Sequence, residues 1–110
     1  MTTYLLSMYY PPTPDAVPAN IDEIMARVGT LTDRMRSEGA LVWTGGLAPT
    51  ATVVAAGHPP LVTEGPYLET SEIMGGFWIL RAGTRDAATH WAVEASEATG
   101  LAIEVREFQQ

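Results

Sequence analysis

The run Phe77-Trp78-Ile79-Leu80 restricts the fold more than any other segment of the chain. Its aromatic and branched side chains follow a Gly-Gly pair and indicate a strand over about 75–81. Successive side chains of a strand point to opposite faces of the sheet, so this strand is apolar on both faces. Each face therefore needs cover from other protein or from a ligand.

Two helices are predicted, and each has one apolar face because its apolar residues recur at spacings of three and four. The first spans about 21–38, since Asn20 is a favoured N-cap, Glu23 can reach back to it, and Gly39 suits the end. The second spans about 85–98. The apolar positions are Ile21, Ile24, Met25, Val28, Leu31 and Met35 in the first helix, and Ala88, Trp91, Ala92 and Ala95 in the second.

Six strands are predicted, at residues 4–10, 40–44, 51–56, 61–63, 75–81 and 102–108. The third and fourth form a hairpin around the turn Gly-His-Pro-Pro. The remaining order is two β-α-β units, which predicts a ferredoxin-like split βαβ sheet of the α+β class with the hairpin as an insertion. At 110 residues, we expect one domain over residues 1–110.

Both helices of this fold lie on one face of the sheet, so they leave the other face uncovered. The first strand repeats the two-sided pattern, because Leu5, Leu6 and Met8 place apolar side chains on both faces. The second face must meet another chain or enclose a ligand. We therefore expect a homodimer.

The formal charge is −7, and all six basic residues are arginines. This acidity disfavours binding to nucleic acid or to anionic membrane surfaces. Cysteine is absent, which excludes disulfides, thiol nucleophiles and thiolate metal sites. The two histidines, His58 and His90, are far apart and expected at the surface, so no metal site is expected. No segment matches a signal peptide or a membrane span, and we expect a cytoplasmic protein.

The segment EGPYLETSEIMGGFWIL (64–80) combines a Gly-Pro-aromatic turn, a Glu-Thr pair and a Gly-Gly-Phe sequence. This combination resembles the DGPF signature of the YciI-like (YCII-related) family. The segments YLLSMYY (4–10), SEGALVWTGGLAP (37–49) and GLAIEVREF (100–108) resemble the same family in the same order. The sequence departs from the signature at Glu64, where the family has aspartate, and at Tyr67, where it has phenylalanine.

The resemblance implies a dimeric α+β barrel, in which two ferredoxin-like sheets pack face to face. Dimeric barrels of this kind include small enzymes that act on organic molecules without a cofactor, so no cofactor is expected. Members of the family mostly have undefined activity. Related modules occur attached to sigma factors of the extracytoplasmic-function type.

The candidate catalytic residues are Glu64 and Glu69, which flank the Gly65-Pro66 turn. The proline fixes the backbone, and burial at the mouth of an apolar barrel favours the protonated form of a carboxyl. Such a group serves as a general acid or base. The alternative is structural: Glu64 accepts backbone hydrogen bonds within the turn, and Glu69 is solvated.

Tyr9, Trp43 and Tyr67 are the candidate ligand-binding residues, since aromatic side chains at strand ends line cavities for small organic molecules. They fit a core or a dimer contact equally well. Gly75 and Gly76 precede a strand, whereas nucleotide-binding glycines follow one. They indicate a close backbone approach or a bulge.

Two functions therefore remain open. The first is a small-molecule-binding barrel that works as a cofactor-free lyase or isomerase, with Glu64 as the acid or base. The second is a non-catalytic dimeric module that senses a small ligand or contacts a partner protein such as a sigma factor. The sequence does not decide whether the protein is an enzyme.

Overall fold

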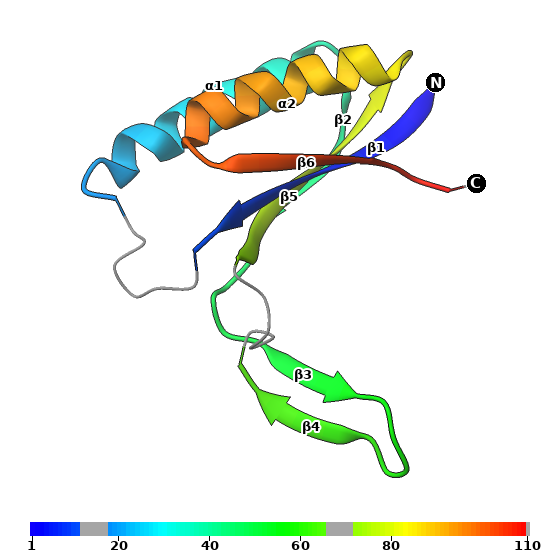
Figure 1. The fold of residues 1–110 in the computed structure, drawn as a ribbon. Coiled ribbons are helices and arrows are strands. Elements are labelled where there is room, and N and C mark those ends of the chain that lie inside the picture. Colours follow the sequence, from blue (N-terminus) through cyan, green and yellow to red (C-terminus); the bar gives the residue numbers. More distant parts are fainter. Residues whose placement is uncertain (12–17, 66–71, 110) are drawn as a thin grey trace.

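A computed structural model of the chain describes residues 1–11, 18–65 and 72–109. Every predicted helix and strand is present, and each boundary lies within two residues of the predicted one (Figure 1). In chain order the elements are β1 (Thr2–Tyr10), α1 (Ile21–Ser37), β2 (Leu41–Gly46), β3 (Thr52–Ala55), β4 (Leu61–Glu64), β5 (Ile73–Ala82), α2 (Arg85–Thr99) and β6 (Ala102–Glu107).

Four of the strands form an antiparallel sheet in the order β2-β5-β1-β6. This order, with both helices on one face, confirms the ferredoxin-like α+β prediction (Figure 1). The hairpin β3–β4 is a separate two-stranded sheet that projects away from the body of the protein. It is the insertion expected between β2 and β5.

The helix ends follow the predicted glycines, but one predicted cap is wrong in detail. Gly39 and Gly100 adopt left-handed backbone angles, with φ of 76° and 73°. Asn20 occupies the N-cap position of α1, yet its side chain makes no capping hydrogen bond. Its backbone has φ −99° and ψ 33°, outside the extended conformation that directs a cap side chain to the first helical turn. Thr84 is extended and accepts from Ala87 N at 3.1 Å.

The core lies between the helices and the sheet. Trp78 and Leu80 of β5 are buried there, at 3% and 0% exposure, beside Leu6 of β1. The indole Nε1 of Trp78 donates to Thr32 Oγ1 at 3.0 Å, so its polar atom has a partner inside the core. The face of α2 toward the sheet is built mainly from alanines, which lets this helix pack closely: Ala88, Ala92, Ala95 and Ala98.

An ion pair joins the outer surfaces of the two helices. The guanidinium of Arg34 donates to both carboxylate oxygens of Glu94, at 2.7 and 3.3 Å. It also lies 5.4 Å from the centre of the Trp91 ring, within range of a cation–π contact. The hydrogen bond from Arg34 lowers the pKa of Glu94 below its ordinary value, more than its partial burial raises it. Neither helix of the described chain is long and apolar enough to cross a bilayer.

The ion pair predicts a stability that depends on pH. A carboxyl whose pKa is lowered by folding stabilises the folded state above its unfolded pKa of about 4.3, and this contribution is lost as the pH falls through the lower folded value. Glu94→Gln should therefore lower the melting temperature at pH 7, and the difference from wild type should vanish below the folded pKa. Glu97→Gln, one turn along α2, is the matched control. A difference that stays constant from pH 7 to pH 3 would contradict the assignment.

Candidate functional site

The face of the sheet that points away from the helices is the candidate functional site, and we call it the open face. Side chains of β1 and β5 alternate, so the buried residues Leu6, Trp78 and Leu80 place their neighbours on the opposite side. The strand register then brings one set of residues together on the open face: Leu5, Ser7 and Tyr9 of β1, Trp43 of β2, Phe77 and Ile79 of β5, and Glu104 and Arg106 of β6.

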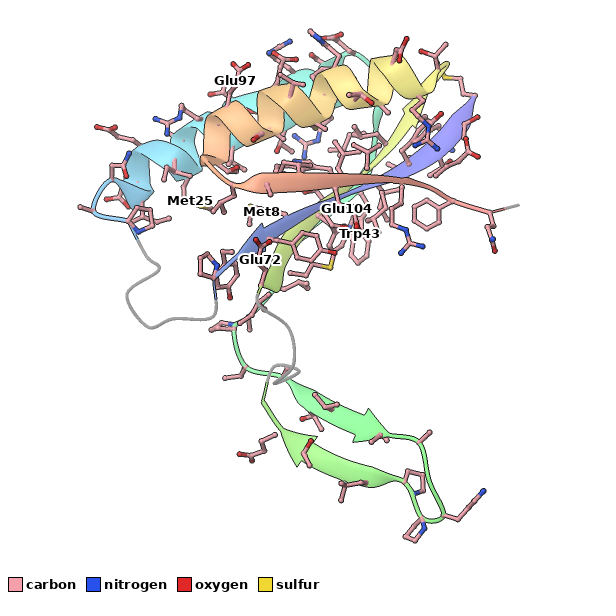
Figure 2. All side chains as sticks on the ribbon, in the orientation of Figure 1. Met8, Met25, Trp43, Glu72, Glu97 and Glu104 are labelled. Carbon is pink, nitrogen blue, oxygen red and sulfur yellow. The ribbon has the colours of Figure 1, made fainter. Side chains whose placement is uncertain are left out.

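The open face is apolar at its centre and is left uncovered by the described elements of the chain. Trp43 is 64% exposed and lies on the side of the sheet away from both helices (Figure 2). Its ring meets that of Phe77 edge to face, with centroids 5.4 Å apart. Gly45 is opposite Phe77 in the register, and a Cβ there would lie 3.5 Å from the Phe77 ring, an ordinary van der Waals contact.

A polar pair borders this aromatic surface. The Tyr9 hydroxyl donates to Glu104 Oε1 at 3.3 Å, across the adjacent strands β1 and β6. Ser7 lies in the same region, in register with both Phe77 and Glu104, and is only 1% exposed because its neighbours are larger. The open face therefore combines aromatic rings, a phenol, a hydroxyl and a carboxylate.

The two glycines at the start of the Gly-Gly-Phe sequence hold the strands close together. A Cβ at Gly76 would lie 3.0 Å from the backbone oxygen of Gly45, and one at Gly75 would lie 2.5 Å from the Tyr10 ring. The ladder between β1 and β5 is also irregular between Met8 and Tyr9. Close approach and a bulge are what the sequence predicts here, and both are present.

Glu64 lies apart from the open face within one chain. It is the last residue of β4, it is exposed, and it borders a shallow depression beside Pro49, Thr50 and Gly65. Gly65 N donates to Ala51 O at 2.8 Å and closes the base of the hairpin. Two further predicted site residues, Glu69 and Tyr67, lie outside the described residues.

The two histidines lie at the surface, as expected. His58 is exposed in the turn of the hairpin, and His90 is exposed on α2, with Nε2 3.7 Å from Glu94 Oε2. Among residues 1–11, 18–65 and 72–109, no three His, Asp or Glu side chains gather as metal ligands would.

Comparison with known proteins identifies the family. The model of the YCII-related domain matches residues 2–109, nearly the whole chain. The chain belongs to the YCII-related family. None of the curated proteins searched matches this YCII-related chain.

A solved structure shares the fold. It is 5-chloro-2-hydroxyhydroquinone dehydrochlorinase (TftG) from Burkholderia phenoliruptrix AC1100, in complex with 2,5-dihydroxybenzoquinone. The alignment covers 98% of the YCII-related chain and 94% of the other, with a TM-score of 0.53 and 16% identity. At 16% identity this comparison shows that the two chains share a fold, and nothing further.

Sequence reasoning missed Glu104 as a member of the site. The alternation of side chains in β6 (Ala102–Glu107) could have indicated its position. Ile103 and Val105 pack against the core, so Glu104 points to the opposite face. Placing β6 beside β1, as a ferredoxin-like order requires, brings that carboxylate next to Tyr9.

The close approach at Gly76 can be tested by adding one methyl group. Gly76→Ala should destabilise the protein by about 1–3 kcal/mol, because the backbone of β2 must move away from β5. Gly29→Ala is the matched control: a Cβ there meets nothing within 4 Å, so alanine should stabilise α1 by about 0.5–1 kcal/mol. Denaturant unfolding measures both, and a neutral Gly76→Ala would show that the strands separate freely.

Proposed function

We propose that the protein is a homodimer whose two open faces pack toward each other and enclose a site for a small organic molecule. We further propose that it is a cofactor-free enzyme of the lyase or isomerase type. The observation that carries the proposal is the apolar, aromatic open face. The described part of the chain leaves this face uncovered, and its Trp43 side chain is 64% exposed.

Burying such a face is the principal driving force for the dimer. Each Å² of apolar surface removed from water stabilises an association by roughly 25 cal/mol before the entropic costs of binding are counted. A two-fold axis through facing sheets uses the same surface on both protomers, which is the commonest symmetry of soluble dimers. Contiguous apolar patches of this kind mark interaction or ligand-binding surfaces.

The residues of the open face suit a planar ligand that carries oxygen substituents. Trp43 and Phe77 offer aromatic surface, while the Tyr9 hydroxyl and the Glu104 carboxylate offer hydrogen-bonding groups at its border. The structural neighbour is a dehydrochlorinase in complex with a dihydroxybenzoquinone, a flat ring of this chemical kind. That likeness supports a small hydroxylated ring as the class of ligand.

Glu64 is the proposed acid or base, and Glu69 the second candidate. Isomerisation needs a group that takes a proton from one carbon and returns it to another atom of the ligand. Elimination needs a base that takes the proton while the leaving group departs with its bonding electrons, and a carboxylate at the edge of an apolar cavity is suited to both reactions. Dimer formation would remove water from the surroundings of such a carboxylate and strengthen its interaction with the ligand.

Sedimentation velocity at two wavelengths tests the dimer and its site together, with 2,5-dihydroxybenzoquinone as the coloured probe. Wild type should sediment as a dimer and carry the quinone with it. Ile79→Asp, on the open face, should give a folded monomer that sediments without the probe, because a carboxylate cannot be buried between the sheets without a partner. Val93→Asp, on the exposed surface of α2, is the matched control and should behave as wild type. A monomeric wild type would refute the dimer.

Glu64→Gln separates catalysis from binding, because the amide keeps most of the hydrogen bonding and cannot transfer the proton. With a substrate found among halogenated and hydroxylated ring compounds, Glu64→Gln should lose at least about 100-fold in kcat while the dimer and the binding of the ring persist. Glu69→Gln is tested in parallel.

Full activity in both glutamine variants would exclude a carboxylate acid or base in this segment. The exposure of Glu64 within one chain is the observation that favours the alternative, a dimeric module that senses a ligand or contacts a partner protein. A dimer that binds the ring and turns over none of the compounds would support that alternative.

A further inference from the structure

The hairpin formed by β3 and β4 carries exposed apolar side chains, and we call residues 52–64 the arm. Val54 and Val62 are directly opposite each other in the register and are each 62% exposed. One step along the same face, Thr52 is opposite Glu64. The arm therefore presents a face on which an apolar pair is followed by a carboxylate.

Among residues 1–11, 18–65 and 72–109, no other part of the chain packs extensively against the arm. β3 and β4 contact each other, and neither makes an extensive contact with the helices or with the four-stranded sheet. The Cα radius of gyration is 15.6 Å, whereas a compact chain of this length has about 13 Å. Figure 1 shows the arm projecting from the rest of the chain, in agreement with this larger value.

An isolated two-stranded hairpin is only marginally stable in water and needs a third strand or another apolar surface. The arm has strand residues of high β propensity, so its sequence favours this conformation once a surface covers it. Val54 and Val62 would otherwise remain in water at 62% exposure each.

The surface that fits the arm is the open face of a second copy of this chain. Glu64 is the only Asp, Glu, Lys or Arg within the arm, so the arm can enter an apolar interface with little cost from burying charge. The open face offers the exposed Trp43 and the half-buried Leu5, Phe77 and Ile79, and the arm of the same chain makes no extensive contact with this sheet. Two arms and two open faces make a closed, two-fold arrangement in which every such surface has a partner.

We propose that the arm of each protomer packs across the open face of the partner subunit and carries Glu64 into the partner's site. This inference rests on the proposed dimer and adds that the site is composite. The aromatic rings, Tyr9 and Glu104 come from one subunit, and the acid or base comes from the other. A single chain then contains every group of the site but cannot assemble it alone.

A dimer assembled from isotope-labelled and unlabelled protein tests this directly, by isotope-filtered nuclear Overhauser spectroscopy. The methyl groups of Val54 and Val62 should give intermolecular cross-peaks to ring protons of Trp43 or Phe77. The inference would be overturned if the methyl groups of Val54 and Val62 gave no intermolecular cross-peaks to these ring protons. If Leu5 and Ile79 still gave intermolecular cross-peaks, the proposed dimer would stand without the exchanged arm. A monomer in sedimentation would refute both.

A pair of substitutions provides an independent measurement on the full chain. Val62→Asp should raise the dimer dissociation constant at least tenfold, whereas Thr63→Asp, the next residue on the opposite face of the arm, should change it less than twofold. Val62→Ala, which keeps the strand apolar, should have an intermediate effect if the contact is a packed one. Equal effects of the two aspartates, with the hairpin intact by amide chemical shifts, would contradict the assigned face.

Discussion

The antiparallel pairing of β1 with β5 at the centre of the sheet determines the rest of the structure. Both strands carry apolar side chains on both faces, so the pair creates two surfaces that water solvates poorly. The helices bury one surface through Leu6, Trp78 and Leu80. The other surface is left uncovered by the elements that the structure describes, and it is where we propose that a ligand and a second subunit bind.

The open face differs from an ordinary exposed sheet in its composition. Antiparallel sheets with one solvated face normally carry polar residues there. Here the charged groups lie at the border on β6 and the Tyr9 phenol lies at the end of β1, while the middle rows hold Leu5, Phe77 and Ile79 together with Ser7, which is 1% exposed. The chain is strongly acidic elsewhere, with a formal charge of −7. On the open face the charged residues Glu104 and Arg106 lie along β6, so charge borders one edge of the apolar surface.

Local sequence rules predicted the elements well because each element is specified by its own residues. The spacing of Leu31 and Met35 gives the helical face, and Gly39 and Gly100 give the ends. The Asn20 cap failed because a favourable residue type does not determine the backbone angles of the loop before it. Glu104 was missed because its role depends on β6 lying beside β1, a long-range pairing. The residues next to Glu104 in the sequence do not indicate that its side chain lies beside Tyr9.

The positions of the site groups were the least predictable part. The turn Gly-His-Pro-Pro correctly indicates a hairpin, and the structure adds that the Gly65 amide closes its base on Ala51. The sequence could not show that the hairpin would project from the body instead of folding over the sheet. That direction is set by packing between surfaces, some of which belong to another molecule in the dimer that we propose.

The strand order has a consequence for how the protein folds during synthesis. β1 is made early, yet its two neighbours are made late: Tyr4 pairs with Leu80 on one side and with Glu107 on the other. The sheet therefore cannot form until β5 and β6 have left the ribosome, and pairing across such long separations is slow. Throughout that interval β1 exposes apolar residues and unpaired backbone groups, the features that lead to aggregation. β1 therefore stays open to aggregation until β5 and β6 pair with it.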